Sequence, residues 1–171
     1  GPFQSNCADL VGDQILPINM LGKEYIAIRT YLNAPFDQLF ITATVNNTHI
    51  YVDGSAVASA TINAGETYNL AMNAESVHII ASEPVAVWQI AGSGCEFGAA
   101  ILPQIKCTGS KRISYVRISS YQLKMNLLVR AGHQQNFTIN NIPLTNATFS
   151  YVPGTNNQWM YCRYDLSSSQ Y

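Results

Sequence analysis

Histidine and cysteine are the side chains in this sequence that most readily supply a metal ligand or a nucleophile. His49, His78 and His133 each stand alone, with no second histidine four residues away, so a zinc site would need all three to be brought together by the fold. A cysteine hydrolase could use Cys95 as nucleophile and His133 as base. We instead expect hydrogen-bonded strand histidines and a disulfide at Cys95. The sequence therefore predicts no catalytic residues, no resident metal and no enzyme.

Carboxylates near the predicted turns give a weaker indication of a calcium site. Asp9, Asp13, Asp37 and Asp53 lie near turns, and loops between strands often hold calcium in extracellular modules. The Asp-x-Asp-x-Asp spacing of a calcium loop does not occur. We expect these residues to form Asx turns, in which the side-chain oxygen accepts a backbone hydrogen bond, and calcium is the alternative.

The four cysteines favour disulfides over a metal site. No two of them lie two to four residues apart, which excludes the usual zinc spacing. Four cysteines allow three connectivities. We predict Cys95–Cys107, because the glycine turn at 94–98 and the bend at 102–103 could fold this segment back on itself. Cys7–Cys162 would then tie the two ends together, and free buried thiols are the alternative.

Three Asn-x-Thr sequons are consistent with an extracellular or cell-surface protein. They begin at Asn46, Asn136 and Asn146, and each is a candidate glycosylation site. An even cysteine count points the same way, because disulfides persist in oxidising compartments. An Asn- and Thr-rich chain also forms sequons by chance, so their use is an expectation.

Charge is segregated along the chain although the net charge is only −1. Residues 1–96 hold nine of the ten acidic side chains, and residues 97–171 hold seven of the nine basic ones. Lys111, Arg112 and Arg117 belong to the basic run, and a strand over 114–117 would place Tyr115 and Arg117 on one face. Such a surface could bind sulfated or sialylated glycans or an acidic protein. Alternatively, the basic half faces the acidic half or a neighbouring domain.

Aromatic residues near the C-terminus suggest a second kind of binding surface. Trp159 and Tyr161 alternate with Met160 and Cys162, so they share one face of a predicted strand. Flat rings suit the faces of sugars, and these two rings could form a glycan platform. One face of this strand must also be core, which is the competing interpretation.

Most of the chain consists of short β-branched and aromatic runs bounded by turn residues. The clearest runs are 25–29, 39–44, 49–52, 77–80 and 85–90, with Asn-Asn, Asp-Gly and Asn-Ala-Gly turns between them. Helical character is confined to a turn or two in residues 5–14. Strands recurring every 8 to 12 residues predict an all-β fold, an antiparallel β-sandwich.

A weak internal repeat suggests two similar small β lobes packed together. Residues 39–54 align with residues 126–141, and each segment then reaches an apolar strand and a glycine turn. The match is one of pattern, so chance similarity between two β meanders is the alternative. We expect an N-terminal segment over 1–19 that includes a tag remnant at Gly1-Pro2, a first lobe over 20–102 and a second lobe over 103–171.

Turn and strand-start motifs spread over residues 10–155 carry a family resemblance. They are Gly22-Lys23-Glu24-Tyr25, Val52-Asp53-Gly54, Asn63-Ala64-Gly65-Glu66-Thr67-Tyr68, Ser82-Glu83-Pro84-Val85-Ala86-Val87-Trp88-Gln89, and Gly94-Cys95-Glu96-Phe97-Gly98 followed by Leu102-Pro103 and Cys107-Thr108-Gly109-Ser110. Together they resemble the IgGFc-binding protein N-terminal domain family. The resemblance implies a β-rich extracellular module of a large secreted or surface protein, which acts in adhesion or ligand binding without catalysis.

These observations predict a binding module rather than an enzyme. We expect an extracellular protein or glycan ligand and neighbouring domains of the same chain as partners, with a carbohydrate-binding module or a structural spacer as alternatives. Nucleic acid is disfavoured because the sequence pI is about 6.3. Membrane insertion is not expected, since no apolar run approaches the roughly 20 residues of a spanning helix.

Overall fold

A computed structural model describes residues 12–31, 37–93, 96–106, 109–116 and 122–167. These residues form antiparallel β-sheets, so the prediction of an all-β fold is confirmed. In chain order the elements are η1 (Ile18–Met20), β1 (Gly22–Ile28), β2 (Asp37–Ala43), β3 (Thr48–Val52), β4 (Ala60–Ile62), β5 (Thr67–Met72), β6 (Ser76–Ser93), β7 (Glu96–Ile101), β8 (Lys124–Arg130), η2 (Gln134–Asn136), β9 (Thr138–Ile139), β10 (Ile142–Pro143), β11 (Ser150–Tyr151) and β12 (Trp159–Asp165).

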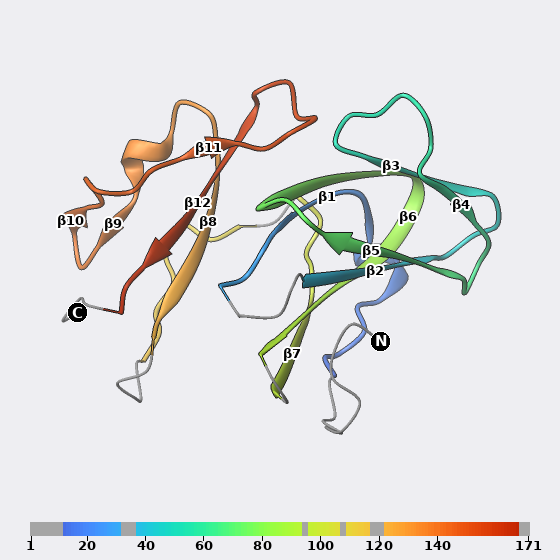
Figure 1. The fold of residues 1–171 in the computed structure, drawn as a ribbon, viewed down its shortest axis with the longest axis horizontal. Coiled ribbons are helices and arrows are strands. Elements are labelled where there is room, and N and C mark those ends of the chain that lie inside the picture. The colour runs from blue at the N-terminus through green and yellow to red at the C-terminus, as the bar shows by residue number, and fades with distance from the viewer. Residues whose placement is uncertain (1–11, 32–36, 94–95, 107–108, 117–121, 168–171) are drawn as a thin grey trace.

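The 18-residue strand β6 organises a seven-stranded sheet (Figure 1). Its first half pairs with β1 and β3, and its second half pairs with β2 and β7. Pro84 lies where the partners change, and proline has no N–H to donate to a ladder. β6 therefore belongs to two layers, β1–β6–β3–β4 and β7–β6–β2–β5.

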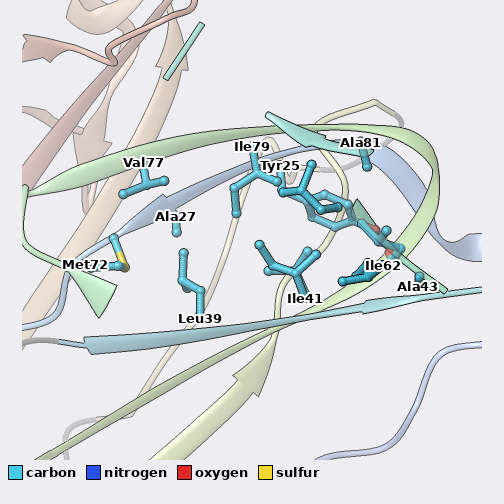
Figure 2. Packing of buried hydrophobic residues seen from close by; sticks show 13 residues of the cluster. Tyr25, Ala27, Leu39, Ile41, Ala43, Ile62, Met72, Val77, Ile79 and Ala81 are labelled. Carbon is cyan, nitrogen blue, oxygen red and sulfur yellow. The ribbon is translucent and has the colours of Figure 1, made fainter. Parts of the chain in front are cut away.

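The main core lies between these two layers. Alternate residues of β6, beginning with Val77 and Ile79, point inward and meet Leu39 and Ile41 of β2 (Figure 2). Tyr25 of β1 enters the same core, and its hydroxyl donates to the Val85 carbonyl at 2.6 Å. The strands β4 and β5 approach each other at one side of the sheet. At the other side β1 and β7 do not pair with each other, so this side is open.

A smaller sheet, β11–β12–β8, packs against the outer face of β1 (Figure 1). Tyr25 and Ala27 face the main core, whereas Ile26 and Ile28 face a second core that contains Val152. β1 is thus buried on both faces and joins the two cores. We call the boundary between the seven-stranded sheet and the β8–β11–β12 sheet the seam.

The two parts of the chain differ in strand pairing, which corrects the expectation of two similar lobes. β2 pairs with both β5 and β6, whereas the aligned strand β8 pairs only with β12 among the described residues. The segment aligned with β3 contains η2 and β9. The similar sequence patterns form different strand pairings, because pairing depends on which faces of the strands become buried. Residues 12–14 are not helical, and the rest of the expected helical segment lies outside the described residues.

No helix in the described part of the chain is long and apolar enough to span a membrane.

Candidate functional site

The predicted basic surface is an exposed segment without regular structure. Lys111, Arg112 and Tyr115 lie in residues 109–116, all of which are exposed, and we call this stretch the basic segment. The expected strand over 114–117 does not form in the described residues, which have no regular structure at 114–116. Val116 is accordingly 84% exposed. Arg117 lies outside the described residues.

Lys111 and Arg112 take no part in the ion pairs of the described residues. Those pairs join Lys23 to Glu83, His78 to Glu24, Lys124 to Asp165 and Arg163 to Glu75. Only the last of them joins the basic half of the chain to the acidic half across the seam. The alternative that the basic half faces the acidic half therefore accounts for Arg163. It does not account for Lys111 and Arg112, which face solvent.

Arg163 of β12 connects the seam to the end of β1. Its guanidinium donates to Glu75 Oε1 at 2.6 Å and to the Thr30 carbonyl at 2.7 Å, and it stacks 4.0 Å from the Tyr31 ring centroid. Its Nε is buried and has no hydrogen-bond partner in the described part of the chain. The hydrogen bond from Arg163 holds the pKa of the Glu75 carboxyl below its usual value.

The two aromatic candidates lie in the seam and do not form an open sugar platform. Tyr161 is only 9% exposed, and its hydroxyl donates to Glu75 Oε2 at 3.1 Å. Burial raises the pKa of this hydroxyl, and so does the bond to the carboxylate. Trp159 is half-buried against the second core, and the Arg130 guanidinium lies 4.7 Å from its ring centroid. The structure therefore supports the interpretation in which this face of the strand belongs to the core and not to a glycan platform.

Two glycine turns meet at the other end of the seam. Gly54 follows β3 and Gly154 follows β11, and both have positive φ angles. His78 of β6 bridges the two sides, because Nδ1 lies 3.1 Å from the Gly154 carbonyl and Nε2 lies 3.0 Å from Glu24 Oε1. The hydrogen-bonded role expected for this histidine is present.

The remaining histidines are separate from one another. His49 Nδ1 lies 2.8 Å from the Thr61 hydroxyl across β3 and β4, and His133 is exposed before η2. Within the described ranges no three His, Cys, Asp or Glu side chains gather as a metal site would require. Cys95, the nucleophile of the alternative hydrolase, lies outside those ranges.

The predicted pairing of Cys7 with Cys162 needs correction. Cys162 is a free thiol, and it is buried in the middle of β12, which pairs with β8. Burial raises the pKa of this thiol. Cys7, Cys95 and Cys107 lie outside the described residues, so Cys95–Cys107 stays a prediction.

The candidate calcium carboxylates Asp13 and Asp53 accept hydrogen bonds from backbone N–H groups. Asp53 has φ of 51° and accepts from the His78 N–H at 2.8 Å. Asp13 accepts from the N–H groups of Ile101 and Gln14, and these bonds lower the pKa of Asp13. Asp9 lies outside the described residues.

The sequons are accessible at their asparagines. Asn46, Asn136 and Asn146 are all exposed, although the Asn46 Oδ1 accepts from the Ala64 N–H at 3.1 Å. Glycosylation at these positions stays a prediction.

A pocket of about 310 Å³ occupies the open side between β1 and β7. It is lined by Ile28, Thr30, Gln89, Ala91, Gly98, Ala99, Ala100 and Asn126. Asp37 lies behind Gln89 and is 2% exposed. Its carboxylate accepts from the Thr30 N–H at 2.8 Å, from the Thr30 hydroxyl at 3.0 Å and from Gln89 Nε2 at 2.6 Å.

The sequence patterns did not predict this pocket. One signal was available, because Gln89 occupies the inward position that follows Val85 and Val87 in an otherwise apolar alternation. Asn126 carried no such signal, since its position beside Ile28 depends on the packing of β8 across the seam.

No curated protein and no solved structure matches the chain. A family model described as IgGFc binding protein matches residues 2–171. The chain therefore belongs to the IgGFc-binding protein family, a family of binding domains.

Proposed function

We propose that this chain is a non-catalytic, extracellular adhesion module that binds an anionic partner, a sulfated or sialylated glycan or an acidic protein surface, through the basic segment. The observation that carries the proposal is the exposure of Lys111 and Arg112 with no ion pair in the described residues. Membership of a binding-domain family supports a ligand-binding role.

The chemistry of the basic segment suits sulfate and carboxylate groups. Arginine presents a planar fork of donors to such groups, whereas lysine offers a mobile point charge. Tyr115 is 43% exposed beside them and adds a flat face. Because these charges are solvent-exposed, binding through them weakens as salt screens the attraction.

Retention on immobilised heparin tests the proposal. The double variant Lys111→Ala, Arg112→Ala should elute at roughly half the salt concentration that elutes the wild type, because two exposed cations are lost. The matched control is Lys23→Ala, Arg29→Ala, which removes the same charge from the acidic half. Equal elution of the wild type and the Lys111, Arg112 variant would contradict the proposal.

A second set of probes separates the classes of partner. Desulfated heparin, a sialylated glycan and the Fc region of immunoglobulin G, named in the family description, are presented to the same three proteins. Dependence on Lys111 and Arg112 identifies the partner that uses the basic segment. A structural spacer would bind none of these probes.

A further inference from the structure

The outer edge of β7 offers main-chain hydrogen-bonding groups. The Leu102 N–H donates to the Val87 carbonyl of β6 at 2.8 Å. Because the main-chain groups of successive residues in an antiparallel strand point alternately toward and away from the partner strand, this bond fixes which residues of β7 point toward β6. Ala100 therefore faces β6, and the N–H and C=O groups of Ala99 and Ile101 point away from it. Asp13 accepts from the Ile101 N–H at 3.1 Å, whereas the Ala99 groups have no partner among the described residues.

In the described part of the chain, the stretch of this edge around Ala99 lacks the residues that usually prevent pairing. Sheet edges are commonly blocked by proline, by charged side chains or by bulges. Glu96 begins the strand, but residues 97–101 contain neither proline nor charge, and Gly98, Ala99 and Ala100 are small. The chain itself already contacts the edge at Ile101 through Asp13, in a stretch without regular structure. A further extended segment could continue along the edge at Ala99.

The adjoining pocket has unused hydrogen-bond acceptors. Gln89 and Asn126 donate through their amide nitrogens to the Ile28 carbonyl at 2.9 Å and 3.2 Å. Gln89 also donates to the Asp37 carboxylate. Because this carboxylate and the Ile28 carbonyl can only accept, the orientation of the Gln89 amide is fixed. The amide oxygens of Gln89 and Asn126 have no partner in the described ranges. Both side chains line the pocket, so these oxygens are available to a donor that enters it.

From these features we infer that an extended peptide segment of a protein partner adds to the outer edge of β7 and places an uncharged hydroxyl or amide side chain in the pocket. The main chain of the peptide pairs with Ala99, and its side chain donates to Gln89 and Asn126. The pocket lining has no aromatic ring for a sugar face and no charged side chain, which favours a peptide over a glycan. This peptide site is distinct from the basic segment.

Two substitutions test the site without removing any core side chain. Gly98→Val adds a side chain within the pocket, and no atom lies within 4 Å of the added Cβ. Ala99→Pro removes only the outward N–H, which does not belong to the β6–β7 ladder. Ala56→Val, in the exposed turn between β3 and β4, is the control.

The probe is a phage-displayed library of random heptapeptides selected on the wild-type chain. Enriched peptides are synthesised, and their dissociation constants are measured by fluorescence polarisation. We expect Gly98→Val and Ala99→Pro to weaken binding by about tenfold or more and Ala56→Val to leave it unchanged. Thermal unfolding by circular dichroism verifies that each variant is folded.

Equal peptide binding by the Gly98→Val variant would overturn the inference, as would a library that yields no enriched peptide. A neutral glycan that binds the wild type and is lost in Gly98→Val would reassign the pocket to sugar. Heparin retention is measured on the same proteins. Because it depends on Lys111 and Arg112, its persistence separates failure of the peptide site from failure of the proposed function.

Discussion

Gly54 and Gly154 lie in direct backbone contact, although one hundred residues separate them in the sequence. A Cβ added at Gly154 would lie 2.3 Å from the Gly54 nitrogen and 2.2 Å from the Asp53 carbonyl carbon. A Cβ added at Gly54 would lie 2.8 Å from the Gly154 Cα. The two parts of the fold therefore meet at a point where only glycine fits on either side.

Gly154→Ala should destabilise the chain by about 2–4 kcal/mol. The substitution combines a side chain at φ of +71° with overlap against backbone atoms that cannot rotate away. Gly65→Ala is the matched control, because Gly65 has φ of +81° but no atom within 4 Å of the added Cβ. We expect a loss of about 1 kcal/mol there. Urea unfolding gives both values. Equal losses would show that the overlap of the added Cβ with the Asp53 and Gly54 backbone costs no stability.

Acid should weaken the seam through Glu75. The pKa of Glu75 is held below its ordinary value of 4.5, first by the hydrogen bond from Arg163. The stabilisation is therefore present above the unfolded pKa and is lost as the pH falls through the folded pKa. We expect Glu75→Gln to unfold more easily than the wild type at neutral pH and to lose less stability on acidification.

Urea unfolding at about pH 7 and about pH 3.5 measures this difference. Glu83→Gln is the control, because the Glu83 carboxylate pairs with Lys23 at 3.1 Å within the seven-stranded sheet. This variant should follow the wild type across the same range. If Glu75→Gln and the wild type lose stability in parallel, the Arg163 contact does not depend on the charge of Glu75.

Local chemistry explains which parts of this fold could be predicted from the sequence. The strand at 85–90 was recognisable because its alternation of side chains and its bounding turns are local properties. The change of partners within β6 was not, since it depends on which of four strands pairs with each half. Tyr161 illustrates the same limit, because alternation placed it on a face with Trp159 but did not show that β1 covers that face.

Cys162 should react slowly with iodoacetamide in the native protein. The thiolate is the reacting species, and burial both raises the thiol pKa and excludes the reagent. We expect alkylation at Cys162 to be slower by about 100-fold or more than in urea, as measured by peptide mass mapping. Failure to react in urea without reductant would show a disulfide at Cys162, and mapping the linked peptides would show whether its partner is Cys7.

Removal of the buried carboxylate of Asp37 should destabilise the open side of the main sheet. Asp37→Ala removes the acceptor of the Thr30 N–H and one of the two acceptors of the Gln89 amide, which keeps its bond to the Ile28 carbonyl. An unsatisfied buried donor costs about 1–3 kcal/mol, so we expect a total loss of about 3–5 kcal/mol.

Asp37→Asn is the matched control for this prediction, because it keeps the size of the side chain and one acceptor oxygen. The Thr30 hydroxyl, 3.0 Å from Asp37 Oδ1, can accept as well as donate, so it can adjust to an amide. We expect Asp37→Asn to lose less than half of the stability that Asp37→Ala loses in urea unfolding. Equal losses would show that the charge of Asp37, and not its hydrogen-bonding geometry, stabilises this side of the sheet.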